Sequence, residues 1–144
     1  MKNIFTETYN KIEELKIQFD AAATEEEKES LRAKYHETMK GIEEQGSTAM
    51  QIWREYEKAL ENGNERLDLN DCIWDKDVKN LIDCIKENGI TEFTFSSSWS
   101  GAVDTAWLFQ QNGCILAGLV EINGGEKTFS EEREKLHAYL FKVN

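Results

Sequence analysis

Hydrophobic residues recur every three or four positions through the first 62 residues of the chain, in three successive stripes. The stripes consist of Phe5, Tyr9, Ile12, Leu15 and Phe19, then Leu31, Tyr35, Met39 and Ile42, then Ile52, Trp53, Tyr56, Ala59 and Leu60. Apolar positions at this spacing, with charged residues between them, predict amphipathic helices. We therefore expect three helices over residues 1–62.

Short signals mark the ends of these helices. Thr24 followed by Glu27, and Thr48 followed by Gln51, have the spacing of a capping box, so each threonine is predicted to start a helix. The third helix is expected to end at Asn62-Gly63, because glycine readily adopts the left-handed conformation there. Narrow stripes favour packing of these helices onto the rest of the chain, while homodimer formation through them stays open.

The pattern changes after residue 63. Asp75 is predicted to cap a short helix that ends at Gly89-Ile90, and the alternation of Phe93 and Phe95 with polar residues predicts a strand over 91–97. The remaining expectations are a helix over 102–111, strands over 114–122 and 138–143, a turn at 123–125, one helical turn in the polar stretch that follows, and a weaker edge strand over 67–74. The tryptophans Trp53 and Trp107 lie on apolar stripes and are predicted to belong to the core.

These elements predict an α+β fold, with about three N-terminal helices followed by a small sheet that contains a strand–helix–strand unit. Neither an internal repeat nor a low-complexity linker divides the chain. We therefore treat residues 1–144 as a single domain with a helical part, 1–62, and an α/β part, 63–144.

The net charge of the chain restricts the classes of molecule that it is expected to bind. It has 17 Lys and Arg against 28 Asp and Glu, a net charge of −11, which disfavours direct nucleic acid binding because such binding depends on neutralising phosphates. No Lys or Arg lies between Lys86 and Lys127. The acidity either serves solubility or provides an acidic face that docks on a basic protein.

The compartment of the protein and the redox state of its cysteines are predicted from the lack of a membrane span, a signal peptide and CxxC spacing in the sequence. No apolar run approaches the roughly 20 residues of a membrane span, and the first ten residues do not resemble a signal peptide. We expect a cytoplasmic protein with no membrane partner. The three cysteines lack CxxC spacing, which predicts reduced, buried thiols and neither a disulfide framework nor a zinc site.

The serine-rich turn after the 91–97 strand is the main candidate site. Its residues, with Trp74 as a second aromatic candidate, are Ser96, Ser97, Ser98, Trp99, Ser100 and Gly101. Small polar residues between a strand and a helix are typical of anion sites, although capping of the helix by Ser98 or Ser100 is the simpler and favoured explanation. A third interpretation is a partner-binding loop anchored by Trp99, since tryptophan is enriched at interface hot spots.

Catalytic and metal chemistry have little support. Of the two histidines, only His137 can be paired with a nucleophile, Cys114, and nothing marks a third residue to orient them. The acids Asp68, Asp71, Asp75 and Asp77 surround Trp74 but lack the glycine turn and terminal glutamate of a calcium loop. We expect no enzyme activity, no metal and no cofactor.

The segment ITEFTFSSSWSGAVDTAWLFQQNGCILAGLVEIN, with the upstream LDLNDCIWD and the terminal AYLFKVN, resembles a family of short, acidic, uncharacterised proteins from gut Firmicutes and their phages and mobile elements. The resemblance covers residues 63–144. It implies a genomic setting in which small acidic proteins often inhibit host defence, and it carries over no catalytic residue.

Two hypotheses of function follow. The first is a non-enzymatic, acidic protein-interaction module, such as a phage or mobile-element inhibitor of a host nucleic-acid-handling defence complex (anti-CRISPR-like). Its partner would be a basic host protein or nucleoprotein complex. The alternative is a small-molecule binding protein that holds an anion or nucleotide on the serine-rich turn at the helix N-terminus; a hydrolase is a distant third.

Overall fold

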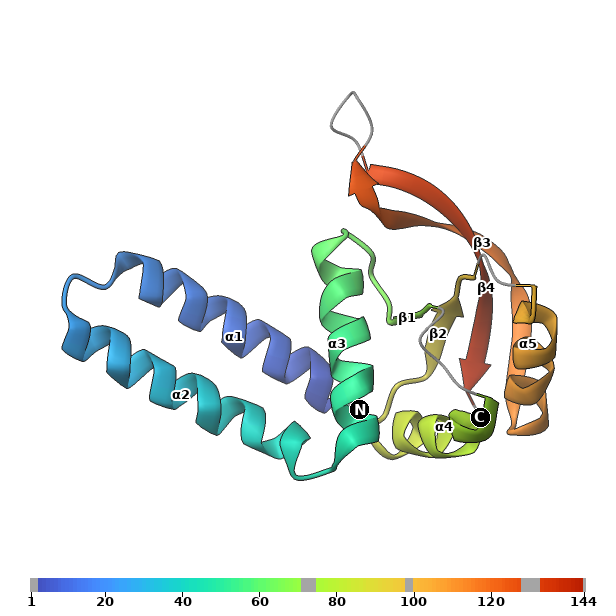
Figure 1. Ribbon diagram of the computed structural model, residues 1–144, viewed down its shortest axis with the longest axis horizontal. Coiled ribbons are helices and arrows are strands. Elements are labelled where there is room, and N and C mark those ends of the chain that lie inside the picture. The colour runs from blue at the N-terminus through green and yellow to red at the C-terminus, as the bar shows by residue number, and fades with distance from the viewer. Residues whose placement is uncertain (1–2, 71–74, 98–99, 128–132, 144) are drawn as a thin grey trace.

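The computed structural model describes residues 3–70, 75–97, 100–127 and 133–143. Its elements are α1 (Ile4–Ala21), α2 (Glu25–Glu43), α3 (Ser47–Glu61), β1 (Asp68–Leu69), the 3₁₀ turn η1 (Asp75–Asp77), α4 (Val78–Glu87), β2 (Glu92–Phe95), α5 (Ala102–Gln111), β3 (Cys114–Lys127) and β4 (Arg133–Val143). Three helices therefore precede a small mixed sheet (Figure 1), which confirms the predicted α+β fold.

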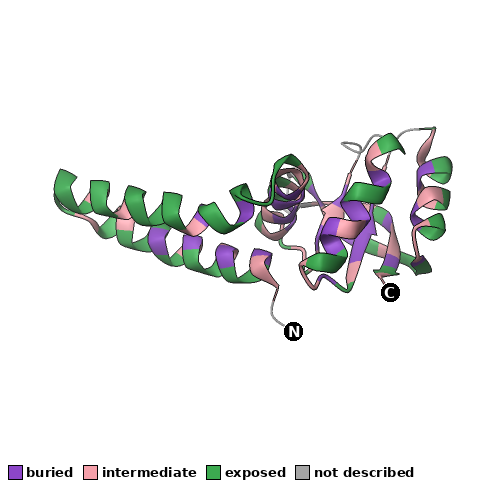
Figure 2. Ribbon diagram, turned by 90° about the horizontal axis from the view of Figure 1, so that it is seen from below, coloured by how far each residue is buried: buried purple, intermediate pink, exposed green. Residues whose placement is uncertain are grey.

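The helices α1 and α2 form an antiparallel hairpin, here called the arm, which projects away from the sheet (Figure 1). Buried residues lie along the inner side of the arm and become sparse toward its tip (Figure 2). The base of the arm packs on α3, where Thr6 Oγ1 and Tyr56 Oη are hydrogen-bonded at 2.8 Å. The apolar stripes predicted from the sequence thus face each other at the base and have fewer neighbours farther out.

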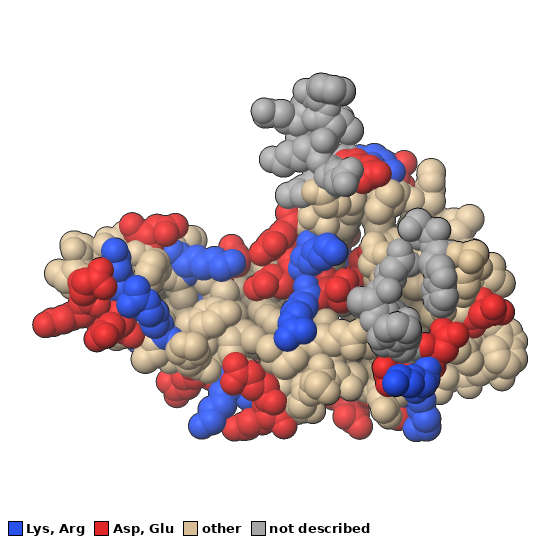
Figure 3. All heavy atoms as spheres, viewed as in Figure 1, with Lys and Arg blue, Asp and Glu red and all other residues tan. Residues whose placement is uncertain are grey.

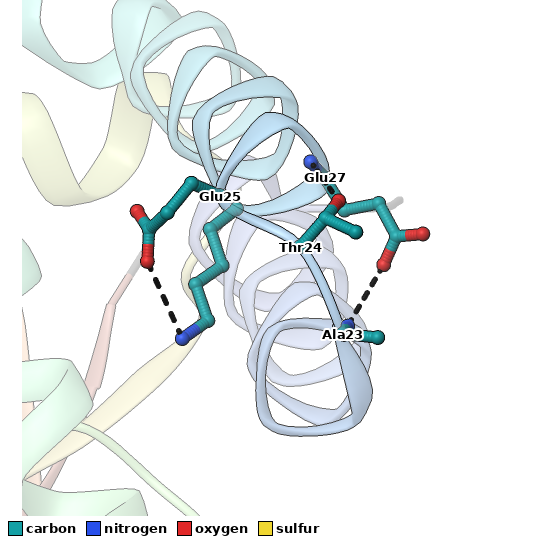
Figure 4. Close-up of polar contacts among 5 residues, drawn as sticks. Ala23, Thr24, Glu25 and Glu27 are labelled. Carbon is teal, nitrogen blue, oxygen red and sulfur yellow. Dashed lines mark hydrogen bonds and ion pairs between the residues drawn. The ribbon is translucent and has the colours of Figure 1, made fainter.

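The predicted capping box fixes the tip of the arm. The Thr24 hydroxyl accepts a hydrogen bond from the backbone N–H of Glu27 at 3.2 Å, and the Glu27 carboxylate accepts one from the N–H of Ala23 at 2.9 Å (Figure 4). One N–H group that the start of α2 leaves without a partner, and the N–H of the residue before the cap, are satisfied in this way. The hairpin turn is therefore defined by side chains that lie within five residues.

The other two predicted caps are wrong. The N-cap of α3 is Gly46, with φ +100°, so the helix begins before Thr48. Glycine adopts this left-handed backbone conformation at a much lower conformational energy than other residues do. The tight turn at Gly46 therefore allows α3 to begin directly after α2 ends. The N-cap of α4 is Asp77, without a side-chain hydrogen bond, whereas Asp75 accepts a hydrogen bond from Thr105 instead.

The sheet has the order β1-β2-β4-β3, with β1 parallel to β2 and the other pairs antiparallel. One of its faces is aromatic: Phe109 of α5 lies 5.2 Å from both Phe93 and Phe95 and 5.3 Å from Phe141 between ring centroids. Buried side chains of α3 and α4 join the same core. The core therefore fixes α5 firmly against the sheet.

The β3–β4 hairpin is longer than the sequence predicts. The expected turn at 123–125 is wrong, since β3 continues to Lys127 and β4 begins at Arg133. The helical turn expected after it falls mainly on residues 128–132, which lie outside the described residues. A register irregularity between Asn123 and Lys127 accommodates the glycines. Gly124 is buried, and a Cβ there would lie 3.1 Å from the Glu134 carboxylate and 3.2 Å from Leu136. Close approach across the strands, and not a turn, explains this glycine.

Within the described residues, no helix is both long enough and apolar enough to cross a membrane.

Candidate functional site

The structure describes part of the predicted serine-rich site. Ser98, Trp99 and Trp74 lie outside the described residues. Ser100 is exposed, and Gly101 occupies the N-cap position of α5 without a side-chain hydrogen bond, so the alternative that Ser100 caps this helix is wrong. The described residues on either side of the serine-rich turn are instead held by hydrogen bonds to carboxylates from other segments of the chain.

Asp68 of β1 gathers the hydroxyl groups at the end of β2. Its carboxylate accepts hydrogen bonds from Thr94 Oγ1 at 2.7 Å and Ser96 Oγ at 2.8 Å, and both of these residues are buried. The parallel register, which sets Asp68 beside Thr94, explains the contact. Hydrogen bonds to an ionised acceptor are stronger than neutral ones, so this cluster holds β1 and β2 together.

A second carboxylate secures the start of α5. The buried Thr105 hydroxyl donates a hydrogen bond to Asp75 at 2.9 Å. The two ends of the serine-rich turn are thus tied to Asp68 and Asp75. Negative charge at both ends raises the electrostatic cost of an anion in the turn.

The structure keeps apart Cys114 and His137, the one nucleophile–base pairing that the sequence allowed and that we did not expect. Cys114 lies opposite Val143, and His137 lies opposite Glu121 farther along the same hairpin. Burial raises the pKa of the Cys114 thiol to about 11, which keeps the thiol protonated at neutral pH. Among the described residues, no group of three or more His, Cys, Asp or Glu side chains is arranged to hold a metal ion.

Trp107 is the largest departure from the sequence prediction. The apolar stripe predicts its side chain in the core, yet it is 56% exposed, and Val103 one turn earlier is 69% exposed. The buried side of α5 is formed by Thr105 and Phe109. Residues at i and i+4 share a helix face, so Val103 and Trp107 point away from the core together.

The neighbouring strand β3 adds two exposed leucines on the same side of the sheet. Leu116 lies opposite Phe141 and Leu119 opposite Tyr139. Directly opposed residues of an antiparallel pair share a face, and the bulge at residue 117 keeps both leucines on the face that α5 covers in part. We call Val103, Trp107, Leu116 and Leu119 the α5–β3 face; their large side chains are 41–69% exposed.

The charges near this face are negative. Asp104 lies beside Val103 on α5, and Glu121 follows Leu119 on the same side of β3, both exposed. No Lys or Arg occurs between Lys86 and Lys127, so α5 and β3 as far as residue 126 carry acids and no base. The Lys86 ammonium, from α4, reaches only the C-terminal end of α5, where it donates to the Asn112 carbonyl at 3.3 Å. In Figure 3 the surface over α5, at the right-hand end, is tan and red. Its chemistry is that of an apolar anchor with an acidic border.

Residues 51–143 match a family described as a domain of unknown function, DUF7698. The chain belongs to this family. No curated protein and no solved structure matches it.

The DUF7698 match begins inside α3 and runs to the end of β4. It includes the whole α5–β3 face, Asp68, Asp75 and the serine-rich turn, whereas α1 and α2 lie outside it. The face is thus part of the DUF7698 region, and the arm lies outside the matched residues.

Sequence reasoning overlooked the α5–β3 face, although a signal is present. The positions 102, 105, 106 and 109 share one side of α5, and 103 and 107 share another. A small sheet can cover only one side of a helix that packs on it. A helix that is apolar on two sides therefore leaves one apolar side exposed, and this pattern in the sequence of α5 indicates an exposed apolar surface.

Proposed function

We propose that the protein is a non-enzymatic protein-interaction module that binds a basic partner through the α5–β3 face. The observation that carries the proposal is the exposure of four large apolar side chains, Trp107 and Val103 on α5 and Leu116 and Leu119 on β3, with the exposed carboxylates of Asp104 and Glu121 next to them in the sequence or on the strand. Exposed apolar patches on soluble domains mark interaction sites. Tryptophan is the residue most enriched among interface hot spots.

The acidic border selects the partner. Opposite charge across an interface speeds association and excludes partners of the wrong sign. A cationic protein surface with an apolar recess complements both parts of the α5–β3 face. The inhibitor function, and a nucleic-acid-handling defence complex as the target, remain predictions that rest on the family resemblance.

The anion or nucleotide alternative remains a prediction for the serine-rich turn. The N-terminus of α5 favours an anion, while the carboxylates of Asp68 and Asp75 oppose one. A thermal-shift screen with nucleotides tests it, because a ligand that binds only the folded state raises the melting temperature.

The proposed function is tested by affinity capture with tagged protein from a bacterial lysate at low and raised salt. The variant Trp107→Ala removes the anchor, and Ile17→Ala, which truncates an exposed apolar residue on the arm, is the matched control. We expect a basic protein to be captured by the wild type and by Ile17→Ala, and to be lost with Trp107→Ala and in salt. Capture that survives Trp107→Ala would contradict the proposal.

The size of the loss can be estimated from exposure. A tryptophan side chain buries about 150–250 Å². With 56% of Trp107 still exposed, an interface covers on the order of 100 Å² more of it, worth about 2–3 kcal/mol. Imperfect packing reduces this gain, so we expect Trp107→Ala to weaken binding by about 10- to 100-fold.

A further inference from the structure

Four asparagines of the chain are followed directly by glycine, and the structure places one of them differently from the other three. These are Asn62, Asn88, Asn112 and Asn123. An Asn–Gly pair can modify itself: the glycine nitrogen attacks the asparagine Cγ, a cyclic imide (succinimide) closes, and ammonia leaves. Glycine makes this attack easier than other residues do, because it has no Cβ to shield its nitrogen.

Three of these pairs are held at helix ends. Asn62, Asn88 and Asn112 are the C-cap residues of α3, α4 and α5, and the glycine after each has a positive φ. The N–H of each glycine donates a hydrogen bond to a carbonyl of its helix, at 3.0 Å or 3.1 Å. The side chains of Asn88 and Asn112 also donate to helix carbonyls, at 2.8 Å and 2.9 Å. The attacking nitrogen is thus engaged at all three helix ends, which opposes ring closure.

Asn123 lies instead at the start of the irregularity in β3. It is paired with Lys135, and the next pair of the ladder is Lys127 with Arg133, so residues 124–126 stand opposite residue 134 alone. A bulge of this kind leaves its extra residues without regular ladder partners. This part of the β3–β4 hairpin extends beyond β2, which pairs only with residues 139–142 of β4 (Figure 1). Neither a helical turn nor regular strand pairing therefore holds the glycine of this pair.

Polar side chains surround the bond between Asn123 and Gly124. The Lys135 ammonium donates a hydrogen bond to Asn123 Oδ1. The Asn64 amide donates to the backbone carbonyl of Asn123 at 2.9 Å and accepts from its N–H at 2.8 Å. The Glu134 carboxylate lies 3.1 Å from the position that a Cβ of Gly124 would occupy. Three polar groups from β4 and the loop after α3 thus converge on this one Asn–Gly pair.

Each of these groups favours one part of the reaction. A cation on Asn123 Oδ1 draws electrons from Cγ and stabilises the negative charge that develops on this oxygen during attack. A hydrogen bond to the backbone carbonyl of Asn123 polarises the peptide bond, which makes the N–H of Gly124 more acidic. The Glu134 carboxylate, next to Gly124, can accept that proton.

We propose that Asn123 is a self-modification site, at which the protein converts this asparagine to aspartate or isoaspartate. The Gly124 nitrogen bonds to Cγ and gives its proton to Glu134, while the Cγ–Nδ2 bond breaks and ammonia leaves with a proton from Lys135. Water then opens the imide at either of its carbonyl groups. A surface pocket of about 250 Å³, whose lining includes Asn64, Asn123 and Lys135, gives water access to this bond.

The products alter the junction between the hairpin and the helices. Either product adds a carboxyl group beside Lys135, and isoaspartate also inserts a methylene group into the backbone of β3. The Asn64 amide then faces a displaced N–H and carbonyl, so the contact between the hairpin and the loop after α3 is weakened. This inference is independent of the α5–β3 face, and its failure leaves the proposed function standing.

Peptide mapping by mass spectrometry tests the site, with the three helix-end pairs as internal controls. Folded protein and protein in urea are kept in mildly alkaline buffer, and each Asn–Gly peptide is followed by its gain in mass as amide becomes carboxyl. We expect the helix-end sites to react about 10-fold or more slowly in the folded protein than in urea, because they react only when the helix end opens. Asn123 should react in the folded protein at least as fast as in urea.

Variants of the neighbouring side chains test the mechanism. Lys135→Ala and Glu134→Gln should each slow the reaction of Asn123 in the folded protein by about 10-fold or more, the least that a positioned proton donor or acceptor contributes. Their rates in urea should not change. Lys142→Ala removes an exposed lysine of β4 that lies opposite Ile115, far along the hairpin, and is the matched control. The helix-end sites, which stay slow only in a folded chain, report whether each variant is folded.

Two results would overturn the inference. One is an Asn123 that reacts no faster in the folded protein than the three helix-end sites do. The other is an unchanged rate at Asn123 in both Lys135→Ala and Glu134→Gln while the helix-end sites remain slow.

Discussion

Removal of the Asp68 carboxylate is expected to destabilise the protein strongly. In Asp68→Ala, the buried hydroxyl groups of Thr94 and Ser96 lose the acceptor that lies 2.7 Å and 2.8 Å away. Thr94 retains a long contact of 3.5 Å to the Leu67 carbonyl, and Ser96 Oγ has no second acceptor within the described residues. A buried polar group without a partner costs about 1–3 kcal/mol. The expected loss in the free energy of unfolding is therefore about 2–5 kcal/mol.

A double-mutant cycle isolates the contact between Asp68 and Ser96. Ser96→Ala alone removes one of the two hydroxyl donors and is expected to cost about 1–2 kcal/mol, since a hydrogen bond to a charged group contributes more than a neutral one. In the Asp68→Ala background the same change should cost little, because the hydroxyl no longer has its carboxylate. The expected coupling is about 1 kcal/mol or more.

Urea unfolding followed by tryptophan fluorescence measures all four proteins of the cycle. The slope of free energy against urea should be the same in each, so that changes in midpoint report stability alone. An Asp68→Ala variant within about 0.5 kcal/mol of the wild type, the range of an ordinary surface substitution, would refute the reasoning. Equal effects of Ser96→Ala with and without Asp68 would show that the serine hydroxyl does not depend on this carboxylate.

Further predictions concern the arm, the thiols and pH. Thr24→Ala should cost about 1 kcal/mol in thermal or urea unfolding because it removes a helix cap, whereas Thr48→Ala, where the capping prediction fails, should cost clearly less. Burial raises the pKa of the Cys84 and Cys114 thiols, so at neutral pH both should resist a thiol reagent until denaturant exposes them; rapid labelling of either one in the folded protein would contradict this. Burial and a neighbouring carboxylate also raise the pKa of Glu57. The folded state therefore keeps this proton to a higher pH than the unfolded chain, and stability falls as pH rises through that interval. Glu57→Gln should raise the unfolding free energy at neutral pH and make no difference in acid, below the ordinary pKa of 4.5; a gain that persists in acid would exclude this cause.

The helices are largely predictable because their signals are local. The apolar stripe and capping residues of α2 lie within its own sequence, and α5 has the predicted bounds of 102 and 111. Local signals fail where contacts with residues distant in the sequence determine the local structure. Gly124 is typical of a turn in isolation, yet the opposite strand uses it for close approach.

The candidate site is harder to predict for a related reason. Periodicity indicates which residues share a side of a helix, but the surrounding fold decides which side is covered. For Trp107 the covered side is the one that holds Phe109, which three phenylalanines of the sheet surround. Likewise, only the parallel pairing of β1 with β2 brings Asp68 to Ser96, 28 residues away in sequence.

The irregularity in β3 has a consequence for solubility. This strand forms an open edge of the sheet and carries exposed Ile115, Leu116 and Leu119, a composition that invites other strands to pair with it and aggregate. The bulge between Leu116 and Gly118, where φ is +147°, interrupts the regular row of backbone donors and acceptors among these residues. A bulge bends and twists a strand, which spoils the template that edge-to-edge stacking requires. The protein can therefore expose apolar side chains on β3 to water, while the irregular backbone of this edge strand disfavours pairing with strands of other molecules and the formation of fibrils.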